Sequence, residues 1–267
     1  MLSPVPLPLQ IATGFLIALT IGLTGVGGGT ITVPVLVLFM GVAAAPAVGT
    51  ALAFSALVKV PAALVYLRQG KIDFGVLRWT LLGGVPGVVA GGFLLGALEE
   101  AGLRNVVLVV VGVTIAVTAV FNLLRLRREP DARPPQRDRR RVLPWLTLPI
   151  GLEVGLSSAG AGALGTLVLL YFTPLTAAQV VGTDLAFGFV LSVVGGGLHL
   201  GLGHTDPALF FRLVAGGIPG AIVGARLATV LPTRTLRIAL LVWLVFLGTQ
   251  LLYRGVDALS AAPVHPW

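Results

Sequence analysis

Glycine and hydroxyl residues interrupt two long apolar segments of this sequence. Residues 9–39 contain Thr24-Gly25-Val26-Gly27-Gly28-Gly29-Thr30, and residues 143–172 contain Ser157-Ser158-Ala159-Gly160-Ala161-Gly162. Each interior glycine costs a helix about 1 kcal/mol, so both runs favour a break. The N–H groups at a new helix N-terminus favour anions, and the hydroxyl groups add donors. The pattern predicts an anion site, and the alternative is that the glycines only let helices pack closely.

Three ionisable residues lie inside other parts of the apolar sequence. Glu153 is about ten residues into its segment, Asp184 is near the start of the next one, and Lys59 is in the latter half of residues 46–67. A charge at membrane depth is costly and marks function by default. We expect Glu153 or Asp184 to carry a proton or pair with a cation. For Lys59, snorkelling to the membrane surface is the alternative.

The composition requires a lipid environment for these segments. The 267 residues have a mean hydropathy of +1.00, and only 10% of them are charged, against about 25% in soluble domains. The apolar stretches are long and do not alternate, which favours helices over a β-barrel. The sequence therefore predicts an all-α, polytopic protein of the cell membrane, with the lipid bilayer as its main partner.

Cysteine is absent, which excludes disulfides, thiolate chemistry and iron–sulfur clusters. The net charge is +8, but residues 125–141 alone hold eight arginines and three acids. A basic run between apolar segments is the signal of a cytoplasmic loop, so we expect no nucleic-acid partner. His199 and His204 lack further ligands at metal spacing, so neither a metal nor a cofactor is expected. The sequence assigns no oligomeric state.

Eight apolar segments follow one another along the chain. They cover residues 9–39, 46–67, 74–98, 103–124, 143–172, 178–200, 208–230 and 235–253. The arginine- and proline-rich stretch 125–142 separates an N-terminal repeat, 1–124, from a C-terminal repeat, 143–267. The sequence thus predicts about eight helices in two homologous four-segment halves, with the first segment of each half broken or re-entrant.

The evidence for duplication is an ungapped internal match. Gly49-Thr50-Ala51-Leu52-Ala53-Phe54 matches Gly182-Thr183-Asp184-Leu185-Ala186-Phe187, an offset of 133 residues (182 minus 49). The same offset brings Gly83-Gly84-Val85-Pro86-Gly87 onto Gly216-Gly217-Ile218-Pro219-Gly220. Glycines at intervals of four form a packing stripe in both copies. Pro86 and Pro219 kink their helices, and we expect them to act as hinges.

The orientation of the two halves has two solutions. Eight simple spans would make them parallel and would place the loops around Lys71, Arg133 and His204, with both termini, on one side. Re-entrant first segments would make the halves inverted. Internal duplication with interrupted helices is typical of secondary transporters in either case.

The order of these motifs resembles one known family. A glycine-rich run is followed by Pro34 and then by the Gly49 motif; the run is Gly22-Leu23-Thr24-Gly25-Val26-Gly27-Gly28-Gly29. The same order recurs in weaker form after the basic linker. This resembles the TauE/SafE sulfite exporters, also called TSUP permeases, over nearly the whole chain. The resemblance implies a cytoplasmic-membrane transporter that moves sulfite, a sulfonate, sulfoacetate or thiosulfate outward.

The leading hypothesis is a secondary transporter that exports a small sulfur-containing oxyanion, with proton coupling as an addition. Its two breaks would converge at mid-membrane with two threonines nearby, and no residue is expected to be catalytic. The expected substrate-binding residues are Thr24, Gly27, Gly28, Gly29, Thr30, Thr50, Ser157, Ser158, Gly160 and Thr183. The alternatives are a passive anion channel and an intramembrane serine hydrolase that uses Ser157 or Ser158 with His199.

Overall fold

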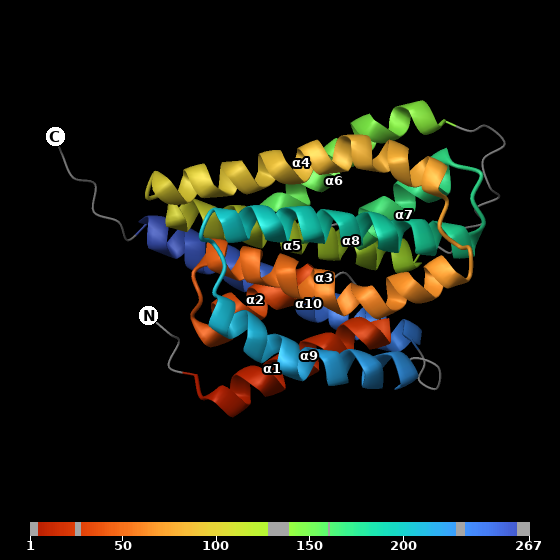
Figure 1. Cartoon of the computed structure of the whole chain (residues 1–267). Coiled ribbons are helices and arrows are strands. Elements are labelled where there is room, and N and C mark those ends of the chain that lie inside the picture. Colours follow the sequence, from red (N-terminus) through yellow and green to blue (C-terminus); the bar gives the residue numbers. More distant parts are fainter. Residues whose placement is uncertain (1–4, 25–27, 128–138, 160, 228–232, 261–267) are drawn as a thin grey trace.

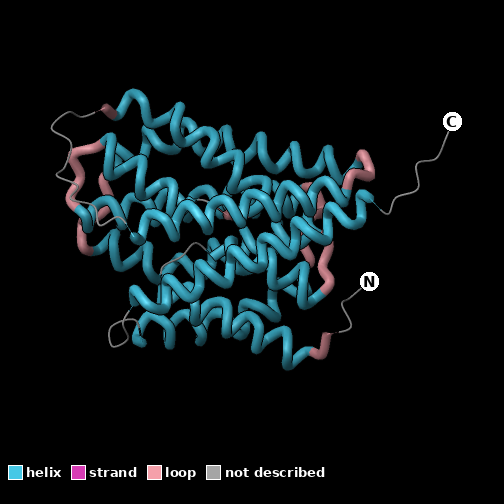
Figure 2. The backbone as a smooth tube through the Cα atoms, turned by 180° about the vertical axis from the view of Figure 1, so that it is seen from behind, coloured by secondary structure: helices cyan, strands magenta, loops and turns pink. Residues whose placement is uncertain are grey.

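The computed structural model describes residues 5–24, 28–127, 139–159, 161–227 and 233–260, and within them all regular secondary structure is helical (Figure 1, Figure 2). The helices of the first half are α1 (Leu7–Thr24), α2 (Gly28–Met40), α3 (Ala44–Arg68), α4 (Phe74–Glu100) and α5 (Arg104–Arg127). A short 3₁₀ helix, η1 (Arg140–Val142), leads into the second half. That half contains α6 (Leu143–Ser157), α7 (Ala161–Phe172), α8 (Ala177–Gly201), α9 (Pro207–Leu227) and α10 (Thr233–Ser260).

The eight predicted apolar segments appear as ten helices because two of them are split. Segment 9–39 becomes α1 and α2, and segment 143–172 becomes α6 and α7. Both interruptions fall in the glycine- and serine-containing runs, as predicted. The other six segments are single helices: α3, α4, α5, α8, α9 and α10 each contain a stretch long and apolar enough to cross a membrane.

Each split segment returns to the end of the bundle where it began. The start of α1 and the end of α2 both lie at the left end in Figure 1. At the opposite end, the backbone N–H of Arg139, just before η1, donates to the carbonyl of Phe172 at the end of α7, at 3.1 Å. The α1–α2 and α6–α7 pairs are therefore re-entrant, and each half adds three full-length helices to its pair.

This arrangement inverts one half relative to the other, so the layout of eight simple spans is wrong. The loop around Lys71 lies beside the start of α8, where an added Cβ on Gly182 would collide with the Lys71 carbonyl. The loop with His204 lies at the other end, beside Gly49 of α3. α1 begins and α10 ends at that second end in Figure 1. Arg133 lies outside the described residues.

Glycine stripes hold the re-entrant helices against full-length ones. A Cβ on Gly83 or Gly87 of α4 would collide with the carbonyls of Pro144 or Leu148 in α6. On α9, Gly216 and Gly220 meet the carbonyls of Ile11 and Phe15 in α1 in the same way. The two α4–α6 contacts correspond to the two α9–α1 contacts, because the glycine and the residue it meets are each shifted by 133 positions. The stripes serve close backbone packing, which is how helices associate in lipid.

The repeated phenylalanines complete this packing. Phe187 of α8 lies against Gly84, and Phe54 of α3 lies against Gly217, again at matching positions. Both rings are completely buried. Large apolar side chains such as Phe39, Phe93, Val117 and Phe211 are more than half exposed on the outside of the bundle. An apolar exterior around a tightly packed interior fits a lipid surrounding.

Substitution of the stripe glycines should separate packing from helix propensity. We expect Gly216→Ala to destabilise the protein by roughly 1–3 kcal/mol, because the new methyl group must displace the Ile11 backbone. Gly197→Ala in α8 meets nothing within 4 Å and should be neutral or stabilising by up to about 1 kcal/mol. Thermal unfolding in detergent measures both, and equal unfolding temperatures would contradict the packing role.

The sidedness of the bundle follows from its basic residues. Described basic residues near the ends of α3 and α7 are Arg68, Lys71, Arg78, Arg139, Arg140 and Arg141. We therefore expect this end to be cytoplasmic. The natural chain has no cysteine, so an introduced cysteine is the sole target of a thiol reagent. In intact cells a membrane-impermeant reagent should label Ala101→Cys and spare Gln69→Cys until the membrane is permeabilised. The reverse pattern would invert the orientation.

Candidate functional site

Each re-entrant pair contains one helix break. α1 ends at Thr24 and α2 begins with Gly28, whereas α6 ends at Ser157 and α7 begins at Ala161. α2 and α7 therefore each start a new N-terminus at a break, where first-turn N–H groups lack partners within the helix. Gly27 and Gly160 lie outside the described residues, as does the side chain of Thr24. Thr30, in the first turn of α2, is buried.

The breaks of the two halves touch each other. A Cβ built on Gly29, at the start of α2, would collide with both the hydroxyl and the carbonyl oxygen of Ser158. Ser158 caps the end of α6 in the left-handed region, with φ of 60°. Its Oγ is buried and has no hydrogen-bond partner among the described residues. The structure thus brings Gly29 and Ser158 together and leaves a free hydroxyl at their contact.

Ser157 has a different environment from its neighbour. Its hydroxyl donates to the carbonyl of Glu153 at 3.0 Å and accepts from the N–H of Ala159 at 3.2 Å. These bonds satisfy the end of α6 from within. The side chain of Glu153 accepts a hydrogen bond from the hydroxyl of Thr118 in α5. Glu153 is therefore anchored to a neutral partner close to the second break.

Lys59 and Asp184, which were singled out separately from the sequence, interact across the α3–α8 crossing. Lys59 Nζ donates to the carbonyl of Gly188 at 3.2 Å and to the hydroxyl of Ser192 at 3.0 Å, and its charge interacts with that of Asp184. Asp184 also accepts from the hydroxyl of Thr166 in α7 at 2.6 Å. This cluster connects α3, α7 and α8. The alternative prediction that Lys59 snorkels to the membrane surface is wrong, because its ammonium group hydrogen-bonds to α8.

Thr50 and Thr183 have roles that the sequence did not suggest. The hydroxyl of Thr183 accepts from the N–H of Asp73 at 3.0 Å, and that of Thr50 accepts from the N–H of Asp206 at 3.3 Å. Asp73 in turn caps α4 through Val76, and Asp206 accepts from Leu209 at the start of α9. Both threonines thus fix the starts of the glycine-striped helices, at opposite ends of the bundle.

Within the described residues, His199 makes no hydrogen bond to either serine. Its Nε2 lies 3.1 Å from the carbonyl oxygen of Gly155, which can only accept, so Nε2 carries the hydrogen. Ser157 donates to a backbone carbonyl and Ser158 has no hydrogen-bond partner among the described residues. A Ser–His pair is therefore not formed in this arrangement. Within the described residues, no three His, Cys, Asp or Glu side chains gather as a metal site.

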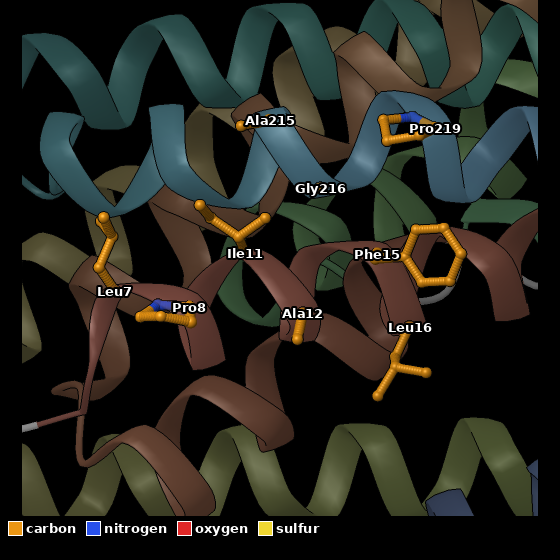
Figure 3. Close-up of a pocket in the computed structure, with 9 residues that line it drawn as sticks. All are labelled: Leu7, Pro8, Ile11, Ala12, Phe15, Leu16, Ala215, Gly216 and Pro219. Atoms are coloured by element: carbon orange, nitrogen blue, oxygen red, sulfur yellow. The ribbon is translucent and has the colours of Figure 1, made fainter.

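The groove between α1 and α9 is unsuited to an anion (Figure 3). It has a volume of about 620 Å³, and its lining includes Ile11, Phe15, Leu16 and Pro219. All nine lining residues are apolar or glycine. The groove offers no polar side chain to an oxyanion, and an acyl chain of the bilayer fits its chemistry. Pro219 lies within α9, as Pro86 lies within α4.

A helical membrane bundle in which two interrupted helices meet inside the protein defines the class of membrane transporters built on broken helices. Comparison with known proteins gives the family. Residues 10–251 match the model of the sulfite exporter TauE/SafE family, and the chain belongs to that family.

Curated relatives carry related names. The chain is 29% identical to "Probable membrane transporter protein YjnA" of Bacillus subtilis, over 82% of this chain and 89% of the relative. It is 24% identical to "Probable membrane transporter protein YunE" of the same organism, over 90% of this chain and 96% of the relative. No solved structure matches the chain. The protein is a multi-pass membrane transporter of the cell membrane.

The Lys59–Asp184 pair should show the signature of buried charges. Lys59→Gln or Asp184→Asn alone should cost roughly 3–5 kcal/mol, because each leaves its partner unpaired. The double variant should lose less unfolding free energy than the two single variants lose when their losses are added. Thermal unfolding in detergent gives the values, with Arg68→Gln at the exposed end of α3 as a charge-matched control. Additive effects in the double variant would show that the two charges are not coupled.

Proposed function

We propose that this protein is a secondary transporter that exports a small sulfur-containing oxyanion, such as sulfite, a sulfonate or thiosulfate, through a site at its two helix breaks. The observation that carries the proposal is the contact of Gly29 with Ser158, where the breaks of the two halves meet beside a buried, unpartnered hydroxyl. The family model is named for sulfite export and supports the substrate class.

Backbone N–H groups and hydroxyls suit this task because transport requires release as well as binding. An oxyanion can accept from the first turns of α2 and α7 and from Ser158 without meeting a dense set of fixed positive charges. Lys59, the basic residue in the interior of α3, already bonds to α8 and interacts with Asp184. The donors at the breaks are therefore weak enough individually to let the anion leave.

Alternating access would come from movement of the two repeats, residues 1–124 and 143–267, about the linker 125–142. The duplication is supported by the packing contacts that recur at the 133-residue offset. The re-entrant helices α1 and α6 each pack on a helix of the other half, α9 and α4. The helices would slide past each other at these glycine-lined interfaces, and Pro86 and Pro219 would act as the hinges.

Proton coupling is assigned to Glu153 rather than Asp184. The carboxylate of Asp184 already has two partners, the hydroxyl of Thr166 and the charge of Lys59. Glu153 has the hydroxyl of Thr118 as its partner and no cation among the described residues. It also lies one turn from Ser157, so its protonation can be linked to occupation of the second break.

Counterflow of labelled sulfite in proteoliposomes tests the transport proposal without knowledge of the coupling ion. We expect saturable uptake that competing sulfonates or thiosulfate inhibit selectively. Ser158→Ala should lower the transport efficiency about tenfold, because one hydrogen bond to the anion is lost. Thr249→Ala is the matched control: among the described residues, its hydroxyl bonds only to its own helix, at the Phe246 carbonyl.

The counterflow assay also separates the proposed transporter from its alternatives. A passive anion channel, the second candidate, would carry flux that does not saturate and shows no counterflow. Folded protein that moves none of these anions would contradict the substrate class. Equal transport by the Ser158→Ala and Thr249→Ala variants would contradict the placement of the site.

A further inference from the structure

A second pocket, unlike the first, has charged residues in its lining and lies at the end of the bundle opposite Lys71 and Arg139. It has a volume of about 330 Å³ and is formed by the end of α2, the start of α3, the α4–α5 turn and the last part of α10. Arg104, Arg254 and Glu99 are its charged lining residues. They come from three helices, so the pocket exists only in the folded bundle.

The two arginines of this pocket are available for a ligand. Among the described residues, neither Arg104 nor Arg254 is in an ion pair or a hydrogen bond through its side chain. Glu99, the acid that could neutralise them, has its carboxylate 3.8 Å from His204 Nε2. Arg104 is also the first residue of α5, where a positive charge opposes the helix dipole. Helix stability therefore does not explain its position, whereas a bound anion would.

Backbone donors complete the pocket. Ala43 is the N-cap of α3 and provides no side-chain cap. Ala44 and Ala45 follow it, are buried, and line the pocket. The first N–H groups of a helix have no partner within that helix, and Pro46 has no N–H at all. Two arginines and the first residues of a helix whose first-turn N–H groups have no partner within it thus line one small pocket.

We propose that this pocket is a second oxyanion site, which holds a small doubly charged anion at the end of the protein where it leaves. The inference rests on the proposed function for the direction of flow, but the binding chemistry is independent of it. Guanidinium groups bind planar or tetrahedral oxyanions through paired N–H donors. Exposed arginines at a pocket mouth also raise the local anion concentration, and their interaction is screened by salt, so release remains fast.

A cysteine at the pocket mouth reports occupation directly. Ala43 is exposed, and Ala43→Cys would be the only thiol of the chain. Sulfate is the probe, because it is an inert dianion that does not react with thiol reagents. In phosphatidylcholine proteoliposomes at constant ionic strength, sulfate should slow labelling of this cysteine by a neutral thiol reagent. With Arg104→Gln or Arg254→Gln added, about tenfold more sulfate should be needed for the same protection.

Arg78→Gln is the charge-matched control, since Arg78 is an exposed arginine of α4 at the other end of the bundle. Protection that persists in this variant and disappears in the Arg104→Gln, Arg254→Gln double variant would establish the site. Absence of protection by sulfate, or its survival in the double variant, would overturn the proposal. So would protection by phosphatidylglycerol in the vesicle without any effect of sulfate, because the pocket would then hold a lipid phosphate.

This assay is separate from transport. If sulfate protects the cysteine but no anion shows counterflow, the pocket stands and the transport proposal fails. If counterflow is observed and sulfate gives no protection, transport stands and the pocket proposal fails.

Discussion

The close approach of glycine backbones in the α4–α6 and α1–α9 interfaces is the constraint on which the rest of the structure depends. In lipid there is no hydrophobic drive that pushes helices together, so association relies on packing and on hydrogen bonds. α1 and α6 stop inside the bundle and cannot be held by the two membrane surfaces in the way a full span is. Contacts such as Gly83 with the Pro144 carbonyl and Gly216 with the Ile11 carbonyl hold them in place instead.

Because these interfaces fix α1 and α6, they also fix where each helix ends. Ser158 can adopt the left-handed conformation and meet Gly29 only if both re-entrant pairs enter to the right depth. The exposed backbone at such an end must be satisfied by protein, ligand or water. Ser157 satisfies part of it internally, whereas the hydroxyl of Ser158 remains for something else. Packing and binding are thus consequences of the same glycine pattern.

Much of this architecture could be predicted from the sequence, because glycine and proline mark backbone requirements directly. The two breaks, the packing stripes and the six unbroken helices follow from local pattern. The return of each broken segment could not be predicted, since a local run does not specify the direction of the next helix. Thr50 and Thr183 were expected beside the site, but their hydroxyls instead hold Asp206 and Asp73. The Arg104–Arg254 pocket was missed because its residues are 150 positions apart (254 minus 104).

One departure from repeat symmetry lies where the two halves cross, between α3 and α8. Lys59 and Ser192 occupy matching positions in the repeats, at the 133-residue offset, and they hydrogen-bond to each other. A contact between matching residues places them near the axis that relates the halves. Two identical residues there would bring two ammonium groups or two hydroxyls together, and the lysine case would be strongly repulsive. One lysine facing one serine, with Asp184 nearby, avoids that repulsion. The asymmetric charges therefore avoid a repulsion that two identical lysines at matching positions would cause. They also leave the interior nearly neutral, as release of an anion requires.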